Sequence, residues 1–392
     1  MTKAAAGEDL DASRRRRTPD LGGRSVTFVL PGYAPHPVGG VRVVLQYANF
    51  LAERGAEVTV LSSRRFLRQT PKAWPSLPLA REAWSWLRER TRAAIGRPVP
   101  WFAVHPKVRV VPSTGLPDHV PRTGEIVVAT AVDTAFWVAE LTRRHGVPGA
   151  YFIQHYEDWA APKEFVDATW RLGLHNIVVA DWLSDIGSQL DVPASLVGNG
   201  YDLTGFPLGP PPSERRASVL AMVSDVPFKR TDLTCQVFSR LLAERPGIFA
   251  ATFGVCERPT ALPPQVQHFR EPSRARLSEL YRDARVFFST SDSEGFGLPV
   301  AEALMSGALC VSTDSGGVRS VAGHEVEVVG RGDVDEVVAR ILTLLDEPPE
   351  AADARARAAR ERLARYGLGD AAERFVATLL ESSTQLREVT SR

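Results

Sequence analysis

Short apolar runs alternate with helical patterns along most of the 392-residue chain, and this alternation limits the folds that it can adopt. The run VTFVL at 26–30 is apolar and β-branched, which is typical of a strand buried on both faces of a parallel sheet. A glycine-containing loop, a helical pattern that stops at Gly55 and the strand-like run EVTVLSS at 57–63 follow it. Strand, helix and strand in this order form a right-handed βαβ unit. The chain is therefore predicted to be an α/β protein.

The stretch GFPLGPPPSERR at 205–216 separates two such alternating regions. It is rich in proline and charge and has no periodicity, which is typical of a linker. We expect two doubly wound, Rossmann-like domains that face each other across a cleft, with helices at the C-terminus. The predicted division is a disordered tail at 1–24, a first domain at 25–204 that holds a Trp/Arg-rich insertion at 64–104, the linker at 205–216, a second domain at 217–370, and a C-terminal helix and tail at 371–392.

Composition argues against several classes of protein. The formal net charge is +1, so no overall field attracts nucleic acid. Three cysteines occur, none of them in a CxxC pair, which fits a reducing compartment. No stretch approaches the roughly 20 apolar residues of a membrane-spanning helix. The sequence shows neither an Asp-x-Asp beside a strand nor a His/Cys cluster. We expect a cytoplasmic protein that needs no metal and no cofactor.

The segment SDSEGFGLPVAEALMSGALCVS at 291–312 carries the main candidate site. A strand-like run precedes it, and Pro299 suits the first turn of the helix that follows. The backbone around Phe296, Gly297 and Leu298 would then lie at a helix N-terminus, which binds phosphate well. Glu302, one turn further, could accept hydrogen bonds from ribose hydroxyls, and Glu294 could reach the group that the phosphates carry. Glutamates at a helix start can also simply complement the helix dipole.

The spacing of Glu294 and Glu302 resembles the E-x7-E signature of retaining GT-B glycosyltransferases of family four. The segment 178–206 is similar to the end of that family's first domain, which leads to an interdomain hinge with Asn199, Gly200, Asp202 and Phe206 at the matching positions. The segment YFIQHYEDW at 151–159 also resembles bacterial rhamnosyltransferases of surface glycans. The resemblance implies that Glu294 contacts the donor sugar, that Glu302 binds the ribose, and that the backbone of residues 296–298 holds the diphosphate.

The resemblance also assigns roles elsewhere in the chain. It places Gly39 and Gly40 in the glycine loop where donor and acceptor meet, and His155, at the end of a predicted strand, against the sugar. Lys229 matches the family's phosphate-binding lysine. The family's arginine is replaced by Ser224, so Arg230 would supply the second charge. Arg319 stands where the family commonly has an acidic residue.

The expected function is transfer of a hexose or deoxyhexose from a dTDP-, UDP- or GDP-linked donor to a hydroxyl of a glycan or small molecule. The resemblance implies retention of configuration without a metal, acceptor binding in the first domain, and closure about the hinge. Two alternatives remain open: an inactive binding protein and a nucleotide-sugar epimerase on the same fold. The insertion at 64–104 could be an acceptor platform, a lid, a membrane-touching patch, or a segment with a small core of its own.

Overall fold

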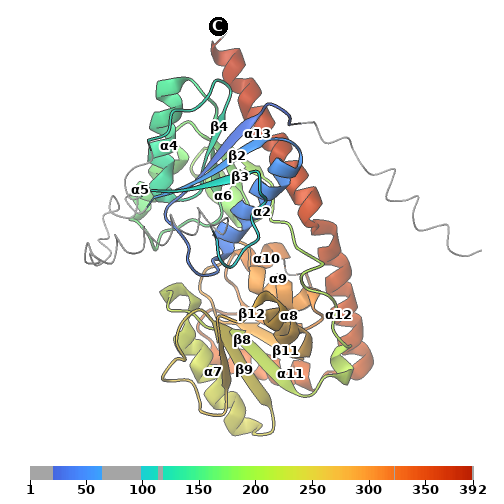
Figure 1. The fold of residues 1–392 in the computed structure, drawn as a ribbon. Coiled ribbons are helices and arrows are strands. Elements are labelled where there is room, and N and C mark those ends of the chain that lie inside the picture. Colours follow the sequence, from blue (N-terminus) through green and yellow to red (C-terminus); the bar gives the residue numbers. More distant parts are fainter. Residues whose placement is uncertain (1–20, 64–98, 114–117, 322, 391–392) are drawn as a thin grey trace, which may run out of the picture.

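The computed structural model describes residues 21–63, 99–113, 118–321 and 323–390. Two domains, each built on a parallel sheet, lie one above the other, and a long C-terminal helix follows one side of the molecule (Figure 1). Among the described residues, no helix combines the length and the apolar content needed to cross a membrane.

The first domain is built on a seven-stranded parallel sheet with the order β3-β2-β1-β4-β5-β6-β7. Val26 of β1 lies beside Val58 of β2 on one side and Ile126 of β4 on the other. The strand order reverses between β1 and β4, which is where a doubly wound sheet opens a crevice for ligands. The elements are β1 (Ser25–Leu30), α2 (Gly39–Glu53), β2 (Glu57–Ser63), β3 (Val108–Ser113), β4 (Ile126–Ala129), α4 (Val132–His145), β5 (Gly149–Ile153), α5 (Lys163–Trp170), β6 (His175–Val178), α6 (Asp181–Gln189) and β7 (Ala194–Leu196).

The second domain has a six-stranded parallel sheet with the order β10-β9-β8-β11-β12-β13, reversed between β8 and β11. The predicted fold class, two doubly wound α/β domains followed by C-terminal helices, is confirmed. The elements are β8 (Ser218–Met222), α7 (Thr231–Glu244), β9 (Phe249–Gly254), β10 (Gln267–Arg270), α8 (Arg274–Asp283), β11 (Val286–Ser289), α9 (Leu298–Met305), β12 (Leu309–Thr313), α10 (Gly317–Val321), β13 (Val326–Val329), α11 (Val334–Leu345), α12 (Pro349–Leu363) and α13 (Leu368–Thr390).

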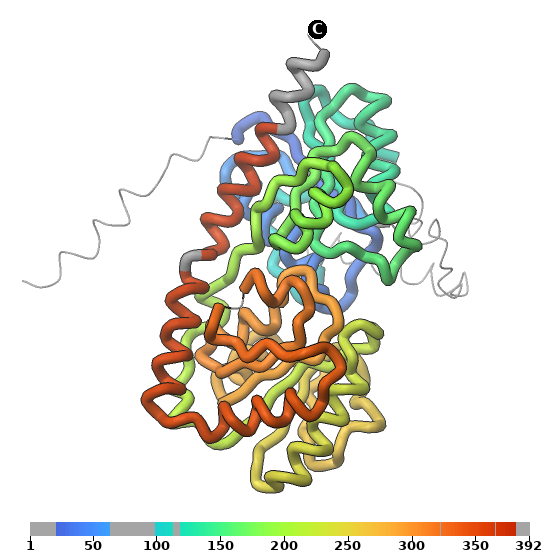
Figure 2. Tube along the Cα trace, turned by 180° about the vertical axis from the view of Figure 1, so that it is seen from behind, coloured from blue at the N-terminus to red at the C-terminus, as the bar shows by residue number. Residues whose placement is uncertain are grey.

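The C-terminal helix returns to the first domain. Figure 2 shows it, in red, continuing from the side of the second domain to the first. The fully buried ring of Phe375 on α13 lies 4.6 Å from the ring of Tyr47 and 5.0 Å from that of Phe152. The last helix therefore completes the core of the first domain, although the chain reaches it only after building the second.

The chain crosses between the domains twice, and the two crossings are hydrogen-bonded to each other. Tyr201 N–H donates to Tyr366 O at 2.9 Å, and Leu368 N–H donates to Tyr201 O at 3.1 Å. A Cβ on Gly200 would lie 2.5 Å from the Cα of Leu368, so the crossings can approach this closely only with glycine there. The predicted hinge thus lies in a paired two-segment connection.

The predicted linker at 205–216 is partly built into the second domain. The Arg215 side chain donates to the carbonyl oxygens of Ala284 at 2.6 Å, Ser306 at 2.7 Å and Pro210 at 2.8 Å. Because a buried guanidinium needs acceptors for its N–H groups, these carbonyls hold the segment in place. The proline- and charge-rich stretch is therefore a connection that packs against the second domain.

Most of the predicted insertion, residues 64–98, lies outside the described residues, and so do Trp74, Trp84 and Trp86. Its end is described: the indole N–H of Trp101 donates to Ala34 O at 2.8 Å. This contact ties the end of the insertion to the loop between β1 and α2.

Candidate active site

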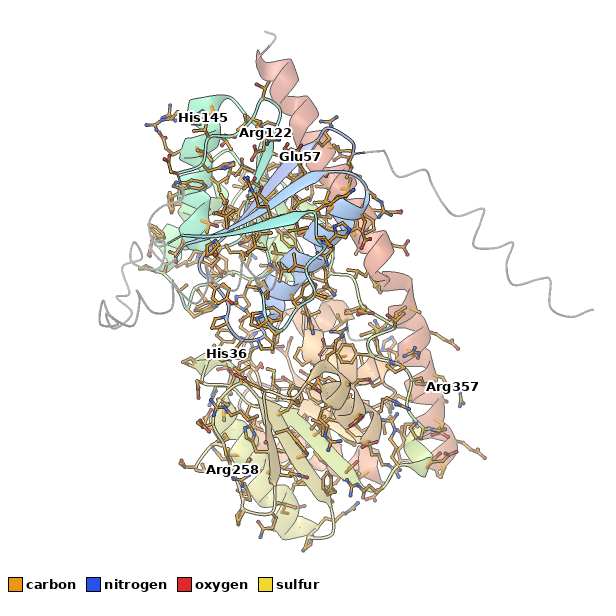
Figure 3. The ribbon with its side chains drawn as sticks, in the orientation of Figure 1. His36, Glu57, Arg122, His145, Arg258 and Arg357 are labelled. Atoms are coloured by element: carbon orange, nitrogen blue, oxygen red, sulfur yellow. The ribbon has the colours of Figure 1, made fainter. Side chains whose placement is uncertain are left out.

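The loops that follow the strands of the two sheets meet between the domains. Figure 3 labels His36, from the loop before α2, at this junction, and its imidazole Nδ1 lies 2.5 Å from a carboxylate oxygen of Glu271 in the second domain. The residues predicted as catalytic, Glu294, His155 and Lys229, lie at the same junction and contact each other directly or through one further residue.

Glu294 is held by its backbone and by Lys229. Its N–H donates to Ser315 O at 2.8 Å, and its carbonyl accepts from the N–H of Gly317 at 2.9 Å. A Cβ at position 317 would lie 2.4 Å from that carbonyl, so glycine is required there. The Glu294 side chain is 8% exposed, and Lys229 Nζ lies 2.7 and 2.8 Å from its two oxygens. The two residues therefore form one nearly buried ion pair.

Ser224 shapes the loop that carries Lys229. Its N–H donates to Thr231 Oγ1 at 2.9 Å, and the Thr231 hydroxyl donates back to Ser224 O at 2.7 Å. Its own hydroxyl accepts from the N–H of Val226 at 3.2 Å. The residue in the expected arginine position is thus a structural part of the turn that ends at Lys229.

His155 faces the second domain as a neutral hydrogen-bond donor. The strand ends at Ile153, two residues before the predicted end, because the last strand pairing is Ile153 with Val178. The His155 Nδ1 accepts from the N–H of Glu157 at 3.0 Å, so the proton of the neutral ring lies on Nε2, which contacts Ser293 Oγ at 2.9 Å. Burial lowers the pKa of His155 to about 4, against the opposing charge of Glu294.

Gly39 and Gly40 lie in the first turn of α2, at the face that meets the second domain. A Cβ at Gly39 would be 3.5 Å from Leu298 Cδ1, and one at Gly40 would be 3.4 Å from the amide of Gln154. A methyl group at either position would therefore meet at most a side chain, at about van der Waals distance. The domains' own packing gives no strong reason for these glycines, which leaves close approach to a ligand as their predicted role.

Gly295 and Gly297, in contrast, are required by the protein itself. A Cβ at Gly295 would lie 1.8 Å from the carbonyl oxygen of Gln154 in the first domain. The Gly295 carbonyl accepts from the indole N–H of Trp182 at 3.0 Å, again across the junction. Gly297 has φ 79° and caps α9, so the chain turns into the helix through a left-handed residue. The predicted diphosphate segment, Phe296 to Leu298, thus starts α9 directly beside the first domain.

Glu302 is paired with a residue of the first domain. Arg42 Nη2 on α2 contacts Glu302 Oε1, and the Tyr281 hydroxyl donates to the other oxygen at 3.2 Å. The Arg42 side chain is 19% exposed and that of Glu302 is 7% exposed. Both carboxylate oxygens predicted to receive ribose hydroxyls therefore have protein partners in this structure.

Arg230 and Arg319 are each paired with acidic residues. Arg230 contacts Asp232 at 3.0 Å and Asp292 at 3.2 Å, and it adopts a left-handed conformation at the start of α7. Arg319 contacts both oxygens of Asp314, at 2.9 and 2.7 Å. Arg319 is thus paired with the residue that follows β12, in an exposed ion pair.

Four residues of the junction, Arg42, Ser293, Gln154 and Trp182, were not predicted from the sequence. The side chains of Arg42, Ser293 and Trp182 make contacts across the junction, and the Gln154 carbonyl lies against Gly295. The importance of these residues therefore depends on how the two domains sit together. The sole sequence signal was the position of Arg42, two residues after the glycine pair at a predicted helix start.

Two further carboxylates of the first domain, Glu157 and Asp133, lie at the start of α4. Glu157 Oε2 accepts from the N–H of Val132 at the start of α4, at 2.7 Å, and Glu157 has φ 60°. Burial raises the pKa of Glu157 to about 7 and that of Asp133 to about 6. In the described part of the chain, no group of three or more His, Cys, Asp or Glu side chains could hold a metal ion.

Comparison with known sequences finds similarity over part of the chain. Residues 258–362 match the family model described as Glycosyl transferases group 1. A stretch of 95 residues is 34% identical to the sulfoquinovosyl transferase SQD2 of Arabidopsis thaliana. This match covers 23% of the chain and 18% of the relative, so the two are alike over a fraction of either length.

Solved structures resemble the whole molecule. Sucrose-phosphate synthase from Thermosynechococcus elongatus superposes with a TM-score of 0.68 at 14% identity, over 94% of this chain and 99% of its own. Anabaena HepE in complex with UDP-glucose gives 0.61 at 14% identity, over 94% and 99%. The protein has the GT-B fold. In a GT-B protein, the junction that holds Glu294, Lys229 and His155 is the cleft between the two Rossmann-like domains.

Proposed function

We propose that this protein is a retaining, metal-independent glycosyltransferase that moves a hexose or deoxyhexose from a nucleoside diphosphate to a hydroxyl of a glycan or small-molecule acceptor. The observation that carries the proposal is the Lys229–Glu294 ion pair beside the start of α9, in the segment that leads into the cleft of a GT-B fold. The match of residues 258–362 to the group 1 glycosyltransferases supports it.

The diphosphate is proposed to bind at the start of α9. The first amides of a helix have no partner within the helix, and the helix dipole favours negative charge there. Lys229 lies beside this position with its Nζ on the Glu294 carboxylate, so a bound phosphate could share the ammonium group with Glu294. As the bond from the sugar to the phosphate breaks, negative charge grows on the phosphate oxygen, which the ammonium group stabilises.

The sugar is proposed to lie between Glu294 and His155. Glu294 would accept hydrogen bonds from sugar hydroxyls, and the Nε2–H of neutral His155, now directed at Ser293, would donate to one. In the proposed front-face reaction, the acceptor oxygen bonds to the anomeric carbon on the face that the phosphate leaves. The acceptor's hydroxyl proton passes to the departing phosphate oxygen. Configuration is thereby retained without a protein nucleophile.

A cytoplasmic location and independence of metal are parts of this proposal. The three cysteines, Cys235, Cys256 and Cys310, are unpaired and buried, which supports a reducing compartment. The proposed counter-charges for the diphosphate are protein groups. Donor turnover is therefore expected to be the same with and without excess EDTA, and a rate that returns only with added Mg²⁺ or Mn²⁺ would contradict this part.

A thermal-shift panel of nucleotide-sugars tests the proposal. UDP-glucose comes first, because the neighbour HepE is solved with it, followed by dTDP-rhamnose and GDP-mannose. A donor that binds the folded state raises Tm by mass action. The donor that does so should be slowly hydrolysed, and proton NMR should show the released sugar first as the α-anomer if the donor is α-linked. The proposal fails if none of these donors, tested to millimolar concentration, changes Tm or is cleaved.

A further inference from the structure

Three basic side chains on the second-domain side of the proposed site already have acidic partners. Lys229 contacts Glu294, Arg230 contacts Asp232 and Asp292, and Arg319 contacts Asp314. A diphosphate brings negative charge of its own. A cation from the first domain would therefore stabilise it at this site.

Arg42 brings such a cation from the opposite domain. It lies two residues after Gly40, in the first turns of α2, and its guanidinium reaches across the junction to Glu302. The pocket around this pair is lined by Leu298, the first residue of α9, and by Tyr201 and Asp202 of the hinge. The guanidinium therefore lies within the same small pocket as the helix start proposed to hold the diphosphate.

The present partner of Arg42 is the carboxylate that a ribose would use. Glu302 has one oxygen on Arg42 and the other on the Tyr281 hydroxyl. When ribose hydroxyls take this carboxylate, the guanidinium needs a new anionic partner, because an unpaired charge in a nearly buried site is costly. A diphosphate next to the ribose is such a partner, and a guanidinium binds phosphate oxygens in a bidentate manner.

Resting on the proposed function, we propose that Arg42 is a donor-binding residue: it exchanges Glu302 for the diphosphate of the bound nucleotide and so takes the place of the arginine that Ser224 replaces. Through its contact with Glu302, the same side chain also holds α2 against α9. Nucleoside diphosphate binding thus keeps Arg42 in the cleft and keeps the two domains together. A nucleoside without phosphates offers Arg42 no new partner.

Isothermal titration calorimetry on a double-mutant cycle tests this assignment. The ligands are UDP, dTDP and GDP, each with its parent nucleoside, and the proteins are wild type, Arg42→Met, Glu302→Gln and the double variant. We expect Arg42→Met to weaken binding of the diphosphate about tenfold to a hundredfold, whether it is introduced into wild type or into the Glu302→Gln variant. Nucleoside affinity should change much less, so that a general folding defect is distinguished from loss of a phosphate contact.

Arg54→Met is the matched control, because Arg54 follows the other end of α2 and pairs with Glu373, away from the cleft. It should bind the diphosphate as wild type does. A loss of affinity that occurs only while Glu302 is intact would overturn the assignment, because Arg42 would then act only by neutralising Glu302. Tighter binding of the diphosphate by Arg42→Met would also overturn it, because Arg42 would then only hold the two domains together through Glu302 and compete with the ligand. If wild type binds none of the three diphosphates, the proposed function itself fails, and this inference with it.

Discussion

The three candidate catalytic side chains are held in defined states by their neighbours. His155 receives a backbone N–H on Nδ1, which leaves the Nε2 proton directed at the second domain. Lys229 and Glu294 neutralise each other in a site with little exposure to water. The polar groups of the cleft are therefore pre-organised. Neutral His155 from the first domain faces the Lys229–Glu294 ion pair of the second, and a polar ligand would bind between them.

The depressed pKa of His155 predicts an acid-sensitive contribution to stability. The pKa lies at about 4 in the folded protein, against an ordinary value of 6.5, so unfolding takes up a proton between these values. Stability from this group is complete above pH 6.5 and decreases as pH falls towards 4, by about 1–3 kcal/mol. Urea unfolding of wild type and His155→Gln across pH 4–8 measures it. Identical pH slopes for the two proteins would contradict the assignment.

Residues with a local pattern around them could be predicted, and residues whose role depends on the other domain could not. Glu294 and Glu302 were predicted from their positions in a strand–loop–helix segment and Lys229 from the family resemblance, and all three lie at the cleft. Arg42 was missed because α2 and α9 are 260 positions apart in the pair that joins them. The role of Arg319 was also hidden, since its partner Asp314 lies on the preceding loop in a geometry set by the turn at Gly316.

At the scale of elements, the loop from β11 to α9 is shaped by the domain that it faces. Gly295 lets the loop touch the Gln154 carbonyl, and Trp182 of α6 binds the Gly295 carbonyl. Buried apolar strands and amphipathic helices were readily predicted from their periodicity. The edge strand β10, QHFR, was not, because it is polar and half-exposed and lacks the apolar run of the other strands.

Gly295→Ala is expected to separate the domains. A methyl group 1.8 Å from a backbone oxygen cannot be accommodated without moving the loop. We expect a loss of about 1–3 kcal/mol in the free energy of unfolding and a larger radius of gyration in small-angle X-ray scattering. Gly247→Ala, where a Cβ would meet nothing within 4 Å, should leave both unchanged. If the Gly295 variant and wild type have the same scattering curve and the same free energy of unfolding, the contact between Gly295 and Gln154 does not hold the domains together.

At the scale of the whole molecule, two paired chain crossings and one returning helix connect the domains. The crossings at Tyr201 and Leu368 form a narrow, hydrogen-bonded connection between the domains, while α13 anchors the end of the chain in the first domain's core. A C-terminal helix was predicted, but its attachment to the first domain was not. An amphipathic pattern shows that a helix has a partner and does not show which of two cores supplies it.

Phe375→Ala tests that attachment. The ring is fully buried between Phe28, Tyr47 and Phe152. Removing it should lower the free energy of unfolding by about 3–5 kcal/mol, from lost burial and a cavity. Urea denaturation followed by circular dichroism measures the change. A loss below about 1 kcal/mol would mean that α13 is not part of the first domain's core.

The central claim is that Glu294 and Lys229 form the donor-sugar site of a glycosyltransferase, and the rate of nucleoside diphosphate release from the identified donor tests it most directly. Glu294→Gln keeps the shape of the side chain and removes its charge, so the fold should survive and turnover should fall about a hundredfold to a thousandfold. Glu279→Gln, an exposed glutamate on α8 paired with Arg276, should release product at the wild-type rate. Wild-type release by a folded Glu294→Gln protein would contradict the account.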